Sequence, residues 1–363
     1  MACCLAPATA GAATRATAPG APATGATFAG FLDETACVTA NDCWAVGQTD
    51  SQFAAAEHWN GSAWSMVPVA GPPGAINSWL PSVSCASRTD CWAVGEYEGS
   101  TGKQVAYAEH WDGTAWSPVA VRVPSGSVLP LLNSVSCAST DSCWASGIVN
   151  GTTYMERFNG RAWTDVRSPG LGSETDIQRV SCPSATDCWV SGNRGIGSHS
   201  GTLTGHWTGG AWAVVTTPTS HNPGDRLVGI SCHANTCMTV GDRNANPNPN
   251  PLAQRWNGSA WTVTPTGIAR ASLSAVSCVS DGTCMAVGGT DGGNGRVFTE
   301  RWAGMRWRVV PAPTPAVSKA ASLVGVACVS SMDCWGVGNY VSTATGDRSL
   351  IEHWNGHAWS VVS

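Results

Sequence analysis

The sequence predicts an all-β fold, a seven-bladed β-propeller with four antiparallel strands and one disulfide bond in each blade. Three observations lead to this prediction. A unit of 45 to 52 residues recurs seven times along the chain of 363 residues, and a repeat of this length is typical of propellers. Each unit holds a pair of cysteines and has tryptophans at fixed places. Glycine (42 residues) and proline (21) are plentiful while charged residues make up only 12%, as expected for short strands joined by many turns.

Each unit has a sequence pattern that predicts four strands. It reads Ser-Val-Ser-Cys, a short turn, Cys-Trp-Ala-Val-Gly, a variable loop, Glu-His-Trp-Asn-Gly and a closing Trp-Ser-Val-Val, as in residues 82–120 and 325–362. An Asn-Gly dipeptide or a near relative joins the last two strands and favours a tight hairpin, because both central residues of a type I′ turn need positive φ. These dipeptides are Asn60-Gly61, Asp112-Gly113, Asn159-Gly160, Asn257-Gly258 and Asn355-Gly356, with Thr208-Gly209 and Ala303-Gly304 as weaker versions.

A closed ring is favoured over an open solenoid. A single sheet of this size cannot bury both of its faces, and radial stacking of seven sheets leaves no long exposed edge. Neither terminal unit looks like the polar cap that a solenoid needs. We therefore expect one propeller over residues 31–363, with blades at about 31–76, 77–128, 129–173, 174–222, 223–269, 270–318 and 319–363. The first unit starts and the last unit ends at the same point of the repeat, so closure must come from blade packing or from the segment Thr27–Leu32.

Fourteen of the sixteen cysteines form seven pairs, and only Cys3 and Cys4 stand outside the repeat. Each pair lies on either side of a short turn, where two side chains meet across a hairpin, so we expect one disulfide per blade. A metal site is the alternative, but the spacing is unlike the usual zinc pattern and no second pair lies nearby in the unit. The pairs are Cys37/Cys43, Cys85/Cys91, Cys137/Cys143, Cys182/Cys188, Cys232/Cys237, Cys278/Cys284 and Cys328/Cys334.

The cysteine content also predicts the compartment. Disulfides persist in oxidising surroundings, so we expect a secreted protein, extracellular or at the cell surface. Residues 1–30 have an Ala-Thr-Ala sequence at 8–10 but no basic start, and we interpret them as the remnant of an export signal and a flexible linker. The sequence has no run of 18 apolar residues, which is about the length needed to span a membrane. The net charge of −5 and the lack of a basic stripe argue against nucleic acid as a partner. We expect the protein to be a monomer.

The order of these motifs resembles a known repeat. Strand, Gly, loop, an aromatic residue with a turn, and Trp before the closing strand are similar to the kelch repeat of galactose-oxidase-like propellers, over residues 33–363. The sequence departs from kelch because the Gly-Gly doublet is a single Gly in six units, doubled only at Gly288-Gly289, and because the Cys pair is extra. It is also similar to the Cys-Trp-Ala-Val-Gly repeat proteins that actinobacteria export. This resemblance implies the fold and no particular activity.

Most tryptophans and a recurring glutamate are expected to belong to the scaffold. Eighteen of the nineteen Trp recur at three positions, with Trp79 as the exception, and we expect the eighteen to fill the space between neighbouring sheets. On the third strand, alternation places Glu109 on one face and His110 on the other. A buried carboxylate is costly unless it is paired, so we expect Glu of one blade to meet His or Arg of its neighbour. Gly205 and Gln254 interrupt this series.

We expect the ligand-binding residues at positions that differ between blades, mainly in loops at one face around the central channel. The variable loops are residues 96–107, 193–204, 242–251 and 339–349. Solvated turns without a binding role are the alternative. The candidate binding residues, which have side chains able to stack on or hydrogen bond a sugar or a peptide, are Trp79, Tyr97, Arg194, His199 and His221.

The sequence has no recognisable catalytic constellation, and we expect no metal and no cofactor. A galactose-oxidase-type copper centre needs two Tyr and two His that converge, and only four Tyr exist. The sialidase box and the H-E-x-x-H and G-x-S-x-G motifs are missing. We favour an extracellular module that binds a glycan or a protein. A structural or adhesive surface protein comes second, and a glycoside hydrolase or lyase with an unrecognised site comes third.

Overall fold

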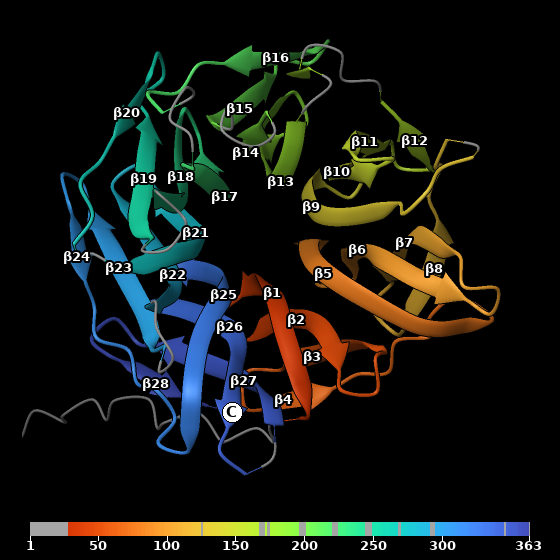
Figure 1. Cartoon of the computed structure of the whole chain (residues 1–363), viewed down its shortest axis with the longest axis horizontal. Coiled ribbons are helices and arrows are strands. Elements are labelled where there is room, and N and C mark those ends of the chain that lie inside the picture. The colour runs from red at the N-terminus through yellow and green to blue at the C-terminus, as the bar shows by residue number, and fades with distance from the viewer. Residues whose placement is uncertain are drawn as a thin grey trace, which may run out of the picture.

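The fold is a ring of seven antiparallel sheets around one axis, seen end-on in Figure 1. The structure is a computed structural model that describes residues 28–124, 126–166, 171–172, 175–195, 201–219, 224–243, 249–267, 270–290, 295–344 and 346–362. Each sheet has four strands in chain order. The expected seven-bladed propeller is therefore confirmed. Within the described ranges, no helix is long and apolar enough to cross a membrane.

The strands of each blade run from the channel outward, and the innermost strand of each blade comes first in the sequence. The first three blades comprise β1 (Gly30–Thr39), β2 (Asp42–Thr49), β3 (Ala54–Trp59) and β4 (Trp64–Met66); β5 (Ala75–Ser87), β6 (Asp90–Gly99), β7 (Gln104–Trp111) and β8 (Trp116–Ala120); and β9 (Leu131–Ser139), β10 (Ser142–Val149), β11 (Thr152–Phe158) and β12 (Trp163–Asp165). The fourth and fifth comprise β13 (Thr175–Ser184), β14 (Asp187–Arg194), β15 (Gly201–Trp207) and β16 (Trp212–Val215); and β17 (Arg226–His233), β18 (Thr236–Arg243), β19 (Asn250–Trp256) and β20 (Trp261–Val263). The last two comprise β21 (Ala271–Ser280), β22 (Thr283–Thr290), β23 (Val297–Ala303) and β24 (Trp307–Val309); and β25 (Ser318–Ser330), β26 (Asp333–Ser342), β27 (Gly346–Trp354) and β28 (Trp359–Val361).

A disulfide joins the first two strands of every blade, as expected. Because the sulfur atoms are bonded to each other, these cysteines are not metal ligands. By the chain-entropy estimate, a bond across so short a loop stabilises the fold by about 2 kcal/mol. With Cα atoms 4.0 to 4.1 Å apart, the seven bonds are Cys37–Cys43, Cys85–Cys91, Cys137–Cys143, Cys182–Cys188, Cys232–Cys237, Cys278–Cys284 and Cys328–Cys334.

The two cysteines of each bond have different surroundings. The first lies on the inner strand, and three of these residues, Cys37, Cys85 and Cys328, line the central channel. The second lies on the next strand outward and is packed inside the sheets, with at most 4% of its surface exposed in any blade. All seven second cysteines contribute to buried apolar clusters that also contain tryptophan, namely Cys43, Cys91, Cys143, Cys188, Cys237, Cys284 and Cys334.

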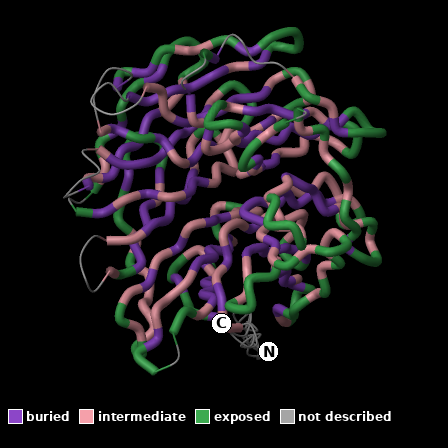
Figure 2. Tube along the Cα trace, turned by 45° about the vertical axis from the view of Figure 1, so that its right-hand side comes forward, coloured by how far each residue is buried: buried purple, intermediate pink, exposed green. Residues whose placement is uncertain are grey.

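Tryptophans fill the space between neighbouring blades. Trp44 of the first blade packs against Trp111 and Trp116 of the second, with ring centroids 4.7 and 5.0 Å apart. Trp92 of the second blade makes the same contacts with Phe158 and Trp163 of the third. Such tilted and edge-to-face pairs are favourable beyond the apolar area that they bury. Figure 2 shows the result, with buried residues along the strands and exposed residues concentrated at the turns.

The same packing closes the ring. Trp335 of the seventh blade lies against Trp59 and Trp64 of the first, with ring centroids 4.7 and 5.2 Å apart. Leu32 belongs to the same buried cluster. The interface between the seventh and first blades therefore has the same tryptophan packing as the other interfaces. The ring is closed, and the alternative of an open solenoid is wrong.

The segment that precedes β1 supplements this closure. The backbone N–H of Phe28 donates to Oγ of Ser349 at 3.1 Å, and the N–H of Ser349 donates to the carbonyl of Phe28 at 3.2 Å. The carbonyl of Ala29 accepts the N–H of Asp50 at 2.8 Å. Phe28 and Ala29 thus tie β27 of the last blade to the first blade. Both expected means of closure are present, although Thr27 lies outside the described residues.

The expected pairing of Glu with His of the next blade is wrong. The third-strand histidines instead bind an Asp at the start of the second strand of their own blade. Each His also lies across from a Trp of the second strand, as His58 does from Trp44 at 4.5 Å, and the Asp lies on the same face two residues away. Arg157 occupies the His position in the third blade and lies over Trp144. The Nε2 to Oδ1 distances are 3.0, 3.0, 2.8 and 2.8 Å for His58–Asp42, His110–Asp90, His206–Asp187 and His353–Asp333.

In the second and sixth blades the recurring Glu accepts a hydrogen bond from the connection that enters its own blade. An oxygen of Glu109 accepts the backbone N–H of Gly71 at 3.1 Å, and Glu300 likewise accepts the N–H of Gly267. In the fifth blade Gln254 replaces Glu and donates to Oγ1 of Thr219 at 2.6 Å. Gly71, Gly267 and Thr219 all lie between the last strand of one blade and the first strand of the next.

These carboxyl groups are buried, and among the described residues no cation forms an ion pair with them, although the charge of Arg122 acts on Glu156. Burial raises the pKa of Glu57, Glu109, Glu156 and Glu300 to about 7 and that of Glu352 to about 8. Each has at least one oxygen without a hydrogen bond within the described ranges. A protonated carboxyl has the shape of the neutral amide found in the fifth blade, and this explains why Gln254 fits there.

The raised pKa values predict that stability falls as pH rises. Between the unfolded value near 4.5 and the folded value near 8 for Glu352, the folded state holds a proton that the unfolded chain has lost, so stability is highest in acid and declines through pH 8. We expect Glu352→Gln to remove on the order of 3 kcal/mol of this decline, measured by guanidinium unfolding at pH 5 and pH 8. The matched variant Gln254→Glu is expected to steepen the decline. Equal pH dependence in wild type and both variants would contradict protonated carboxyls.

Candidate binding site in the central channel

Every inner strand carries a β-bulge at the same place, four or five residues before its first cysteine. The repeated glycine of the second strand lies opposite, because a Cβ at Gly47 would overlap the carbonyl oxygen of Phe31, and the six equivalent glycines are crowded in the same way. A bulge leaves a residue unpaired and redirects its side chain. The bulge residues are Asp33, Leu80-Pro81, Asn133, Gln178, Val228, Ser274 and Val324.

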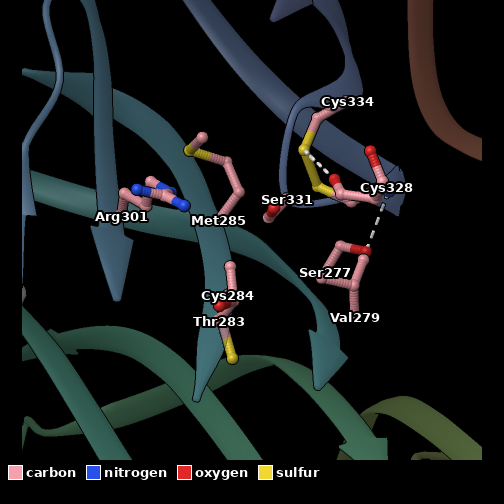
Figure 3. A pocket seen from close by; sticks show the side chains of 10 residues that line it. Ser277, Val279, Thr283, Cys284, Met285, Arg301, Cys328, Ser331 and Cys334 are labelled. Atoms are coloured by element: carbon pink, nitrogen blue, oxygen red, sulfur yellow. Dashed lines mark hydrogen bonds between the residues drawn. A yellow bond between two sulfur atoms is a disulfide. The ribbon is translucent and has the colours of Figure 1, made fainter. Parts of the chain in front are cut away.

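Serine hydroxyls join neighbouring inner strands around the channel. Figure 3 shows one example, in which the backbone N–H of Cys328 donates to Oγ of Ser277 at 3.0 Å. The residue before the first cysteine plays this part at five interfaces. Ala36 and Ala327 replace the serine in the first and seventh blades. The five serines that accept the next blade's cysteine N–H are Ser84, Ser136, Ser181, Ser231 and Ser277.

Two charged side chains meet across the channel at a position two residues earlier on the inner strands. The position three residues before the first cysteine is small in five blades, but it is Glu34 in the first and Arg179 in the fourth. Nε of Arg179 lies 3.3 Å from Oε2 of Glu34, and the side chains are only 20% and 15% exposed. Arg179 Nη1 also donates to the carbonyl of Asn133 at 3.0 Å. We call the Glu34–Arg179 pair the crossbar.

Trp79 lies next to the crossbar and is held by an acidic bulge residue. Its indole N–H donates to Oδ2 of Asp33 at 2.6 Å, which joins the second blade to the first. Burial raises the pKa of Asp33 to about 6, although this hydrogen bond and the charge of Arg179 lower it. Burial likewise raises the pKa of Glu34 to about 7 against the charge of Arg179. Trp79, Asp33, Glu34, Arg179 and Asn133 form what we call the channel cluster.

A cavity of about 280 Å³ lies on the disulfide side of the crossbar. Inner strands of all seven blades line it, from the level of Glu34 and Arg179 to the ring of first cysteines. Serine hydroxyls and small apolar side chains make up most of its wall. We call this space the lower cavity, and we call the opposite face, where the inner strands begin, the upper face.

Three further hollows lie outside the central channel. The gap in Figure 3, between the sixth and seventh blades, measures about 10 Å³ and is lined by repeat residues such as Thr283 and Ser331, so it holds about one water molecule. Two polar hollows of about 250 and 230 Å³ lie on the upper face of the same blades, one of them beside Arg296 and Lys319. Within the described ranges, no group of three or more His, Cys, Asp and Glu side chains is placed to hold a metal ion.

The predicted binding residues are not gathered in one place. Trp79 belongs to the channel cluster. Tyr97 lies on the other face of the same strand pair, since Trp79 pairs with Glu96 and Tyr97 with Ser78, and its ring packs edge-on against Tyr107 at 5.6 Å. Tyr97 therefore packs within the blade. Arg194 ends β14, where it pairs with Thr175 and Gly201 and has no contact with the cluster among the described residues. His199 and His221 lie outside the described residues.

The buried cysteines predicted to form disulfides are scaffold residues and not part of a ligand site. Their side chains are enclosed by the neighbouring sheets, so a ligand in the channel cannot reach them. The second cysteines line neither the lower cavity nor the two polar hollows, and only Cys284 and Cys334 border the small gap of Figure 3. With 0 to 4% of their surface exposed, the second cysteines are Cys43, Cys91, Cys143, Cys188, Cys237, Cys284 and Cys334.

Four members of the channel cluster were missed by reasoning from the sequence. The predicted site lay in loops, whereas Asp33, Glu34, Asn133 and Arg179 lie on inner strands. The sequence did contain a signal, because Glu34 and Arg179 stand where the second and third units have the first serine of Ser-Val-Ser-Cys. The sequence alone does not show that this position faces the axis of the ring. Even the predicted loop 96–107 is mostly strand, since β6 and β7 leave only residues 100–103 between them.

The comparisons with known proteins identify the fold. No family model and no curated protein matches the chain. Similar solved structures include YCF48 bound to D1 peptide (14% identity, 90% of this chain and 94% of that one, TM-score 0.55) and the SapL1 lectin in complex with α-methyl fucoside (14%, 80% and 97%, TM-score 0.52). The GH74 xyloglucanase from Xanthomonas campestris is also similar (12%, 93% and 55%, TM-score 0.61). At such identities the likeness shows a shared propeller fold and no shared activity.

The crossbar predicts a measurable coupling between its charges. Arg179 lowers the pKa values of both Glu34 and Asp33, so Arg179→Gln should raise the pKa of Glu34 above its present value of about 7. Carbon-13 NMR titration of the side-chain carboxyls measures this change. Arg161→Gln, on an exposed hairpin, is the control and should leave Glu34 unaltered. An unchanged pKa in Arg179→Gln would show that the two side chains do not interact in solution.

Proposed function

We propose that this protein is an extracellular binding module that holds a glycan at the upper mouth of its central channel, around Trp79. The single observation that carries the proposal is that departures from the repeat converge there. Trp79 is the one tryptophan outside the three repeated positions, and it is fixed by Asp33 beside the crossbar. A residue that serves the blade is expected in every blade, whereas a residue that serves a ligand is needed only once.

The shape of the upper face supports this location. β5 and β25 begin ten residues before their first cysteines, whereas the other five inner strands begin six or seven residues before theirs. Each extra residue adds roughly 3.3 Å of strand. The second and seventh blades therefore rise above the first blade between them, and Trp79 stands in the wall formed by β5 and β6.

The residue types in this wall suit a sugar. Glu96 pairs with Trp79 and points to the same side, and burial together with the charge of Glu98 raises its pKa. Asn77 donates to Glu98 at 2.8 Å, which fixes both polar groups in advance. An indole offers a flat apolar surface for the C–H face of a sugar ring, and carboxyl and amide groups accept or donate hydrogen bonds to its hydroxyls.

The seven disulfides and one similar structure support the same proposal. Seven disulfides suit an oxidising, extracellular compartment. The SapL1 lectin, solved with α-methyl fucoside, is a sugar-bound propeller of similar fold. Its ligand belongs to that protein, and it supports the present proposal only by showing that such a fold can carry a sugar site.

A protein ligand is the second candidate, favoured by exposed apolar side chains beside the same wall. Phe53 is 46% exposed and Ile76 51% exposed. The N–H of Ala54 donates to Oγ of Ser78, which holds the segment of Phe53 close to β5. Exposed apolar side chains that gather on one face commonly mark contacts with another protein.

A glycan array followed by calorimetry tests the proposal. We expect saturable binding of at least one extracellular glycan, with Trp79→Ala weakening it tenfold or more, a loss of about 1.4 kcal/mol or more. Ser272→Ala, at the equivalent position of the sixth blade, is the matched control and should bind as wild type does.

Other outcomes separate the alternatives. Binding of peptides but of no glycan would favour the protein ligand. Binding of neither, with the protein held at a cell surface, would favour a structural or adhesive role. Release of sugar during incubation would favour a hydrolase or lyase. Glycan binding that survives Trp79→Ala would place the site elsewhere.

A further inference from the structure

The lower cavity is lined by hydrogen-bond donors that the fold does not use. Oγ of Ser84, Ser231 and Ser277 each accepts a backbone N–H from the next blade. An oxygen that accepts in this way still has its own O–H to donate, and within the described ranges none of these hydroxyls donates to protein. All three serines line the cavity. A wall of free donors favours an acceptor-rich, negatively charged ligand.

Arg179 provides the positive charge for such a ligand. Its Nη1 is bound to the carbonyl of Asn133, while among the described residues Nη2 makes no hydrogen bond. Nε faces Glu34 at 3.3 Å but lacks the geometry of a directed hydrogen bond. A guanidinium binds a carboxylate best through two parallel N–H groups. Glu34 does not make this two-point contact, so it leaves room for a better anion.

Glu34 is a counter-ion that can lose its charge. Oε1 accepts only the N–H of Thr35 at 3.2 Å, and burial raises the pKa of this carboxyl to about 7. Glu34 and Arg179 are the only ionisable groups that line the lower cavity in the described chain, and Asp33 is the nearest further charge. When Glu34 is protonated, Arg179 loses its nearest counter-ion, and the carboxyl of Asp33, which is bound to Trp79, is the acidic group that remains near it. The small net positive charge that is left matches a monovalent anion better than a divalent one.

We propose that the lower cavity binds a small monocarboxylate through Arg179, with Glu34 taking up one proton from solvent as the ligand's carboxylate replaces it. The volume of about 280 Å³ suits one sugar-acid or amino-acid residue. The chemistry recognised is a carboxylate, supplied by a uronic acid or by the end of a peptide. This site is distinct from the one proposed around Trp79, because the crossbar lies between them.

Calorimetry of the full chain tests the proposal at pH 6 and pH 8. The probes are D-glucuronate and N-acetyl-L-alanine, with D-glucose and N-acetyl-L-alaninamide as their neutral counterparts. We expect at least one acid to bind and its neutral counterpart not to bind. Affinity should fall about tenfold from pH 6 to pH 8, because binding requires the protonated fraction of Glu34. If one acid binds and the other does not, the result identifies the source of the carboxylate.

Variants separate the roles of the two side chains. Glu34→Gln mimics the protonated carboxyl and should bind with a much smaller fall between pH 6 and pH 8, the remainder coming from Asp33. Arg179→Gln should lose binding. Arg179→Lys keeps the charge without the two-point contact and should bind more weakly, which provides a test if Arg179→Gln does not fold. Arg161→Gln should bind as wild type does. Failure of both acids to bind at pH 6, undiminished binding by Arg179→Gln, or an undiminished tenfold fall from pH 6 to pH 8 in Glu34→Gln would each overturn the proposal.

Discussion

Each blade has two apolar faces, and the packing of tryptophan between neighbouring sheets is what buries them. Trp44 lies against Trp111 and Trp116 of the next blade, and Trp335 does the same with Trp59 and Trp64 where the ring closes. The indoles are large enough to fill the space that widens away from the axis. Near the axis the sheets approach closely, and five of the seven blades carry a small residue three positions before the first cysteine. The serine bonds between neighbouring inner strands form where this packing brings the sheets together.

The repeated glycine connects the blade frame to the channel. It stands opposite a bulge because a side chain at Gly47 would collide with the backbone of the inner strand. The bulge in turn directs residues such as Asp33 and Asn133 toward the axis. A local requirement of the second strand thus sets which positions of the first strand face a ligand.

In the central channel, the same charged residue cannot be repeated in every blade, because the like charges would repel one another. Seven copies of one carboxylate at the level of Glu34 would face each other at short range, and like charges so close cannot all ionise. An ion pair across the axis therefore has to come from blades that differ, as Glu34 and Arg179 do. The loss of symmetry follows from placing charge at the axis, and it marks the residues that the scaffold does not need.

The sequence by itself determined the blades. The period, the cysteine pairs, the hairpin dipeptides and the recurring tryptophans are local or repeated features, and each one predicts the same four-stranded unit. It also identified Trp79 as an exception. Tertiary structure decided which side chains meet. His110 binds Asp90 of its own sheet rather than a glutamate of the next, and Arg179 reaches Glu34 from three blades away. Such partners depend on strand register and on the closed ring, which brings residues 145 positions apart to within 3.3 Å. Strand alternation within one unit carries no information about that distance.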